Sequence, residues 1–280
     1  MLGRTHEEKY SDFLKNRVLK LLVPFILISA VYYIYDAWQS NTSVTLGDFL
    51  LKFSNNEIKY HFWFMYAIIL IYLLIPFLAK MVSHLNKQEL LNLILVLAGG
   101  NLINTVTYIA SSWGVEALTA WSYPNLLCYI NYLFLGYYLY HYGIARHWRK
   151  WIYFAGILSI VLMPVLDILT IKTVRTDALF VAGALGPLVA STALFTFFRS
   201  APINWSEPWQ KFFRLAAPLV FSIYMIHVLV MNIIKAKLLT FWTPAHFIEV
   251  CGFIVVEFGA TLIVSFLIAL LLTHLKRIRS

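Results

Sequence analysis

Eight apolar stretches of about twenty residues constrain this chain more than any other feature. Each is close to the roughly 20 residues that a helix needs to cross a hydrocarbon core about 30 Å thick. The stretches are too long and too uniformly apolar to be strands of a membrane barrel. The sequence therefore predicts an all-α, polytopic transmembrane bundle of about eight helices. The predicted spans are residues 18–38, 61–80, 90–110, 122–141, 151–171, 178–198, 214–234 and 247–273.

The lysine and arginine residues predict how these helices are oriented. Of the 22 basic residues, 16 fall in the N-terminal tail, at the C-terminal end or in the connections after spans two, four and six, and 6 fall on the opposite side. By the positive-inside rule, we expect both termini to be cytoplasmic. We also expect the protein to lie in the cytoplasmic (inner) membrane. This bias, together with contact to anionic membrane lipids, accounts for a net charge of +9, so no nucleic-acid partner is expected.

The composition, 61% hydrophobic and 12% charged, excludes an ordinary soluble globule. We expect a cytoplasmic segment at residues 1–17, a single transmembrane domain at 18–275 and a cytoplasmic tail at 276–280. The longest connection, about 39–60, lies on the outer side. Cys128 and Cys251 fall inside spans, so we interpret both as small packing residues and expect neither a disulfide nor a metal site.

Two ionisable residues lie deep inside predicted spans, where each costs a few kcal/mol unless it faces a partner or a cavity. His227 is about eight residues, roughly 12 Å, from the outer end of span seven, and Glu257 is at similar depth in span eight. Tyr224 lies one turn before His227. The three are candidates for an acid/base group, or for a structural hydrogen-bonded pair that joins two helices. Four others we interpret as solvated or interfacial positions near the outer surface: Glu57, His61, Asp167 and Glu249.

Basic residues also cluster at the cytoplasmic ends of the helices. Arg17 and Lys20 are three residues apart at the start of span one, which places them on one helical face. Such a cluster can hold the phosphates of a cytoplasmic ligand. The alternative is that these are ordinary topogenic and snorkelling cations. Further cations on the same side are Arg146, Arg149, Lys150, Lys211 and Arg214.

Three segments, in this order and spacing, together resemble the membrane acyltransferase 3 family, and a weaker match supports them. They are the basic pair Arg17-x-x-Lys20 with Leu-Leu-Val-Pro-Phe, the helix His61-Phe-Trp-Phe-Met-Tyr-Ala with Tyr72-Leu-Leu-Ile-Pro76, Phe221-Ser-Ile-Tyr-Met-Ile-His227, and the weaker Phe134-Leu-Gly-Tyr-Tyr138. The resemblance implies a ten-helix protein that moves an acyl group, usually acetyl, from cytoplasmic acyl-CoA to a hydroxyl of an extracytoplasmic carbohydrate or lipid-linked acceptor, such as a cell-surface polysaccharide.

The resemblance also implies roles for single residues. The family's basic pair corresponds to Arg17 and Lys20, where a lysine replaces the usual second arginine and loses its bidentate fork. His227 corresponds to the histidine of the family's Ser-x-Tyr-x-x-His motif, to which we give a structural or supporting role. Nothing in this chain matches the family's first helix with its Arg and its histidine thought to be catalytic. We therefore expect either a chain that begins two helices late or a divergent, inactive member of the family. In both cases this chain should have little acyltransferase activity by itself, whereas a form that begins two helices earlier should be active.

Two other function classes stay open at this point. A transporter or flippase of a polar or glycan-linked solute would use the same buried polar residues, and would show paired repeats or broken helices. The second class is a membrane protein that binds a partner and has no catalytic activity. Labelled acyl transfer would support the enzyme, and flux without covalent change would support the transporter.

Overall fold

The computed structural model of the chain describes residues 10–112, 125–170, 184–201 and 204–278. All regular secondary structure in these ranges is helical. In chain order the elements are α1 Tyr10–Phe13, the π-helix η1 Leu14–Val18, α2 Leu19–Gln39, α3 Leu46–Ser54, the 3₁₀-helix η2 Tyr60–Phe62, α4 Trp63–Ser83, α5 Lys87–Ser112, α6 Asn125–His141, α7 Arg146–Thr170, α8 Leu185–Ser200, α9 Glu207–Ala216, the 3₁₀-helix η5 Ala217–Leu219, α10 Val220–Leu239 and α11 Phe247–Ile278.

Six helical segments in the described residues are long and apolar enough to cross a membrane. They correspond to the first three, the fifth and the last two predicted spans. The other two are occupied by α6 and α8, which have 17 and 16 residues, and both predicted spans begin outside the described residues. The prediction of an all-α, multi-pass bundle is confirmed.

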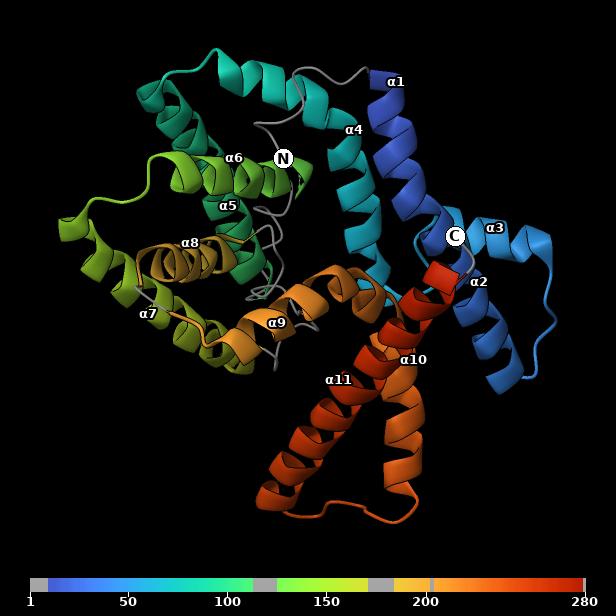
Figure 1. Cartoon of the computed structure of the whole chain (residues 1–280). Helices are drawn as coiled ribbons and strands as arrows, with labels where there is room; N and C mark the ends of the chain where they lie inside the picture. The colour runs from blue at the N-terminus through green and yellow to red at the C-terminus, as the bar shows by residue number, and fades with distance from the viewer. Residues whose placement is uncertain (1–9, 113–124, 171–183, 202–203, 279–280) are drawn as a thin grey trace. The chain divides into compact units, whose positions relative to one another are not determined.

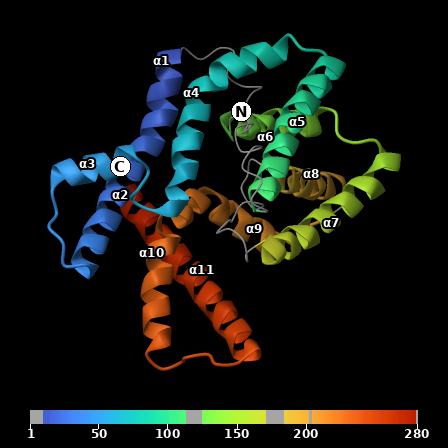
Figure 2. The ribbon, with the colours of Figure 1, turned by 180° about the vertical axis from the view of Figure 1, so that it is seen from behind.

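The helices form two compact units. One contains the described parts of Met1–Val18 and Phe64–Ile203, and the other contains Leu19–Trp63 and the described part of Asn204–Ser280. In the first unit α5 packs against α6, and α7 lies alongside α8 (Figure 2). Its core is aliphatic and aromatic, with Ala79, Ile94 and Phe134 among the buried residues. The expectation of one domain over 18–275 stays a prediction.

The second unit is built on the helix pair α10 and α11, which run antiparallel and diverge toward their connection at 240–246 (Figures 1 and 2). Helix α2 packs against α10. An aromatic cluster joins α2, α3 and η2. The ring centroid of Phe25 in α2 lies 5.1 Å from that of Phe53 in α3 and 5.2 Å from that of Phe62 in η2. Such contacts fix the segment around Phe62, and with it the preceding His61.

The connection at 39–60, which was predicted on the outer side, is not an irregular loop, because α3 forms within it. Thr45 caps this helix by accepting a hydrogen bond from the backbone N–H of Asp48, 3.2 Å away. One turn along, the Lys52 ammonium lies 2.9 Å from the Asp48 carboxylate, and this hydrogen bond lowers the pKa of that carboxyl. The sequence analysis missed α3 because nine residues are too few for a clear hydrophobic period.

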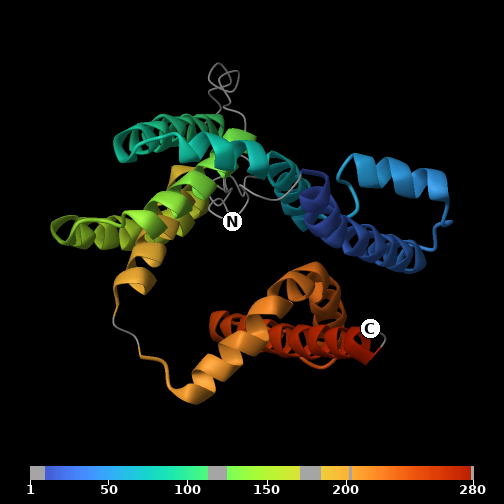
Figure 3. The ribbon, with the colours of Figure 1, turned by 45° about the horizontal axis from the view of Figure 1, so that its top comes forward.

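The predicted span at 214–234 is divided in the structure. Helix α9 ends at Ala216, a 3₁₀ turn containing Pro218 follows, and α10 then continues to Leu239. Proline lacks the backbone N–H that an α-helix needs, which explains the break. Helix α9 passes across α11 (Figure 3), where the rings of Phe212 and Phe266 lie 6.2 Å apart. Because α10 continues to Leu239 and not only to residue 234, His227 lies further from the C-terminal end of its helix than predicted.

Candidate active site

Two imidazole rings meet in the second unit. His61, in η2, and His227, in α10, have ring centroids 5.2 Å apart with the rings at 65°. His61 is only 7% exposed, and neither of its ring nitrogens has a hydrogen-bond partner among the described residues. Buried polar groups are nearly always paired, so an unpaired one calls for an explanation. A substrate group that binds at this site would provide one.

The position of His61 is fixed through its backbone. The hydroxyl of Tyr224 donates a hydrogen bond to the backbone carbonyl oxygen of His61, which ties η2 to α10. The Tyr224 ring also packs against the His61 imidazole, with centroids 5.7 Å apart. Because its hydroxyl is used in this contact, Tyr224 positions His61 in this geometry.

His227 is held in one tautomer by its own helix. Its Nδ1 lies 2.6 Å from the backbone carbonyl oxygen of Tyr224. A carbonyl oxygen can only accept a hydrogen bond, so Nδ1 carries the proton. In the neutral ring, Nε2 then has the free lone pair, and this is the arrangement that a general base requires.

Helix α2 closes the site with Tyr32, which is fully buried. Its ring lies 5.8 Å from the His61 ring, and its hydroxyl accepts a hydrogen bond of 2.8 Å from the backbone N–H of Leu229. The Lys59 ammonium lies over the Tyr32 ring, 5.6 Å from its centroid, and is 2.8 Å from the Asp36 carboxylate. A charged pair therefore lies beside the apolar and aromatic wall around His61.

A groove of about 340 Å³ between α10 and α11 contains both ionisable residues that the sequence placed at one depth. His227 and Glu257 both line it, together with the buried hydroxyl group of Thr261. The remainder of the lining is apolar: Ile223, Met231, Ile254, Phe258 and Leu262. His227 thus contacts His61 while it lines the groove.

The predicted phosphate-binding pair lies at the start of α2. Arg17 belongs to the π-helix η1, and its guanidinium lies over the Phe13 ring at 5.3 Å. Lys20 is exposed in the first turn of α2. The shared face was predicted from an α-helical period, whereas a π-helix has a longer hydrogen-bond repeat. Their role in binding stays a prediction.

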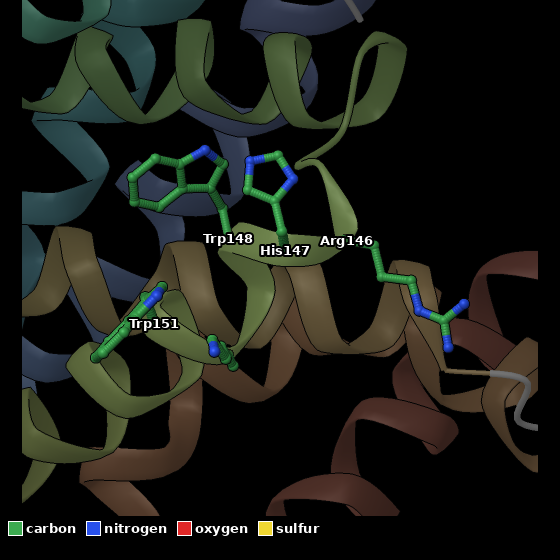
Figure 4. A pocket seen from close by; sticks show the side chains of 5 residues that line it. Arg146, His147, Trp148 and Trp151 are labelled. Atoms are coloured by element: carbon green, nitrogen blue, oxygen red, sulfur yellow. The ribbon is translucent and has the colours of Figure 1, made fainter.

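Two of the other cations predicted on the cytoplasmic side, Arg146 and Lys150, line a surface hollow of about 370 Å³ at the start of α7, whereas Lys211 and Arg214 belong to α9. Trp148 and His147 project to one side of the helix, and Arg146 projects to another (Figure 4). Lys150 and Trp151 complete its lining. All five residues come from a single helix start, the position at which snorkelling cations and interfacial tryptophans are expected in any membrane protein.

Of the four ionisable residues assigned to the outer surface, the interpretation of His61 as solvated or interfacial is wrong, because it is buried. Glu57 and Glu249 are exposed, and the Glu249 carboxylate accepts from the backbone N–H of Ala245 before α11. The side chain of Asp167 is outside the part that the structure describes. One sequence feature could have indicated a role for His61: it is the first residue of the segment His61-Phe-Trp-Phe, which carries part of the family resemblance.

The sequence analysis also missed a polar seam between α5 and α6. Asn131 donates to the side-chain oxygen of Asn101 at 3.2 Å, and Asn104 donates to the Cys128 sulfur at 3.4 Å; these side chains are buried. Amides that bond across two helices stabilise packing inside a membrane. We interpret the seam as structural, because its groups largely bond to one another. Within the described ranges, no group of three His, Cys, Asp or Glu side chains could hold a metal ion.

The six long apolar helices of the described residues place this molecule among the multi-pass membrane proteins. Its second unit contains a pair of histidines in contact. A family model described as an acyltransferase domain, that of the acyltransferase 3 family, matches residues 1–274. The chain belongs to this family, which supports a membrane acyltransferase-type function. Neither the curated proteins nor the solved structures gave a match.

Proposed function

We propose that this protein is an O-acyltransferase of the cytoplasmic (inner) membrane, with both termini cytoplasmic. It moves an acyl group from cytoplasmic acyl-CoA to a hydroxyl of an extracytoplasmic carbohydrate or lipid-linked acceptor. Membership of the acyltransferase 3 family supports the reaction class. The observation that carries the proposal is the contact between His61, whose ring nitrogens are buried and unpaired within the described residues, and His227, whose Nε2 is available as a base.

In the proposed mechanism, Nε2 of His227 removes the proton of the acceptor hydroxyl. The oxygen attacks the carbonyl carbon of the thioester and forms a tetrahedral intermediate. Its collapse breaks the C–S bond, and the imidazolium returns the proton to the departing CoA sulfur. The products are an ester and free CoA. Proton transfer by a positioned base contributes a factor of about 10² to 10⁴.

Neighbouring groups support this proton transfer. Glu257 lines the same groove as His227, and a carboxylate there would stabilise the imidazolium. His61 would donate a hydrogen bond from a ring N–H to the acceptor or to the developing oxyanion. Arg17 and Lys20 would bind the CoA phosphates from the cytoplasmic side.

The proposal is tested with the purified chain in proteoliposomes, supplied with labelled acyl-CoA and a mixture of cell-envelope glycans as acceptors. Acyl transfer predicts label in an ester product together with stoichiometric release of free CoA thiol. Movement of a glycan across the bilayer with no ester formed would instead indicate a transporter. The sequence alone gave His227 a supporting role and predicted little activity of this chain by itself, whereas the contact between the two imidazoles makes His227 a candidate base.

A further inference from the structure

The groove between α10 and α11 is more spacious than an acetyl group requires. We propose that it binds a medium-length fatty acyl chain of the donor, with the hydroxyl of Thr261 donating a hydrogen bond to the acyl carbonyl oxygen. This inference rests on the proposed function, which supplies the acyl chain. It names a donor class different from the acetyl group that the family resemblance implies.

The hydroxyl of Thr261 is the first observation. In helices, threonine usually satisfies its hydroxyl by bonding the carbonyl four residues earlier. Threonines elsewhere in this chain do so at 2.7–2.9 Å: Thr105, Thr192, Thr196 and Thr273. Thr261 is 7% exposed, lines the groove, and has no partner for its Oγ1 among the described residues. Ser265, one turn further, is likewise unpaired, but it does not line the groove.

The shape and lining of the groove are the second observation. A dry cavity of about 150 Å³ accepts a benzene ring, so the 340 Å³ here has room for roughly twice that amount of hydrocarbon. Its walls are mostly apolar, with Ile223 and Met231 on α10 and Phe258 and Leu262 on α11. A flexible chain of methylene groups matches this lining.

The position of the polar groups is the third observation. His227 lies in the wall of the groove and also contacts His61. Thr261 is one turn after Glu257 on α11, so their side chains share a face. An acyl chain that lies along the apolar wall therefore places its carbonyl between the Thr261 hydroxyl and the proposed base.

The steric test compares adjacent residues on α11. Leu262 lines the groove and is 50% exposed, whereas Ile263 is 61% exposed and does not line it. With octanoyl-CoA and acetyl-CoA as donors, the wild type should prefer octanoyl by at least about tenfold in kcat/KM, the effect of burying about two methylene groups. Leu262→Trp should abolish this preference, and Ile263→Trp should keep it. Active enzymes with the same preference in both variants would overturn the inference while leaving the proposed function intact.

The hydroxyl is tested in the same assay with isosteric variants. Thr261→Val should lower kcat/KM for octanoyl-CoA about tenfold, because a hydrogen bond to the carbonyl is lost. Thr192→Val, which removes a hydroxyl that bonds its own helix, should change it less than about twofold. Equal effects of the two variants would contradict the role of Thr261.

A binding test separates the groove from turnover. A diazirine-bearing octanoyl-CoA should label peptides of α10 and α11 in the wild type and in Ile263→Trp, but not in Leu262→Trp. Labelling without any acyl transfer would contradict the proposed function and would support binding of the acyl chain in the groove. Equal labelling by a phospholipid with the same diazirine chain, not displaced by octanoyl-CoA, would show that the groove holds bilayer lipid and would overturn the inference.

Discussion

The imidazole of His61 lies edge-on to that of His227, with 5.2 Å between ring centroids, although the two residues are 166 positions apart in the chain. Each ring is positioned by a contact to Tyr224: the backbone of His61 accepts from its hydroxyl, and Nδ1 of His227 donates to its backbone carbonyl. One tyrosine therefore organises both histidines. This arrangement turns two weak sequence signals into one candidate acid/base site.

The first prediction concerns the ring nitrogens of His61. His61→Phe keeps an aromatic ring among its neighbours but removes the two unpaired nitrogens. We expect kcat to fall roughly 10²-fold, the scale of one lost oxyanion donor, with thermal stability in detergent unchanged or raised, because a buried unpaired polar group is removed.

The control for His61 is Tyr60→Phe, a neighbouring position that is 72% exposed. This variant should retain full activity. Wild-type kcat in His61→Phe would show that the imidazole serves packing alone.

The second prediction concerns Tyr224, whose hydroxyl bonds the His61 backbone. Tyr224→Phe should destabilise the protein by about 1 kcal/mol, the net worth of one hydrogen bond. It should lower kcat less than the loss of His227 does, because it displaces the acid/base pair without removing it. A loss as large as that of His227→Gln would instead make Tyr224 a group that acts directly on the substrate.

The third prediction tests the basic pair at the start of α2. Replacing both Arg17 and Lys20 by Gln should weaken CoA binding by roughly 1–3 kcal/mol, the scale of charged hydrogen bonds. Lys211→Gln is the control, because Lys211 is an exposed cation paired with Glu207 at 2.8 Å. Isothermal titration with CoA measures the effect. Unchanged affinity in a folded double variant would refute the assignment.

The fourth prediction concerns orientation. Single cysteines at positions 43 and 205, in a chain with Cys128 and Cys251 replaced, should be labelled from opposite sides of the membrane. Position 43 should react with an impermeant maleimide added outside intact cells, in agreement with the distribution of basic residues. Labelling of position 205 from outside would reverse the proposed topology.

The sequence predicted the helices well because a membrane span is a local property: twenty apolar residues suffice to define one. It also placed His227 and Glu257 at one depth, since consecutive antiparallel spans share a scale of length, and the structure places both in one groove. Breaks within a span and short helices were harder to predict from the sequence. The 3₁₀ turn at Pro218 and the helix α3 depend on individual residues that a hydropathy average conceals.

The burial of His61 could not be predicted in the same way. At the end of a span a histidine is usually solvated, and His61 is buried because Tyr32 of α2 and Tyr224 and His227 of α10 pack against its ring. Similarly, the unpaired hydroxyl of Thr261 is visible only when its helix neighbours are known, because most helical threonines satisfy themselves locally.

The turnover of the purified chain with and without His227 tests the role of this histidine as the base most directly. With labelled acyl-CoA and cell-envelope glycans in proteoliposomes, the wild type should form labelled ester, and His227→Gln should lower kcat by about 10² to 10⁴ while it remains folded. Equal turnover by the two proteins, or none by the wild type, would contradict the claim that this histidine is the base.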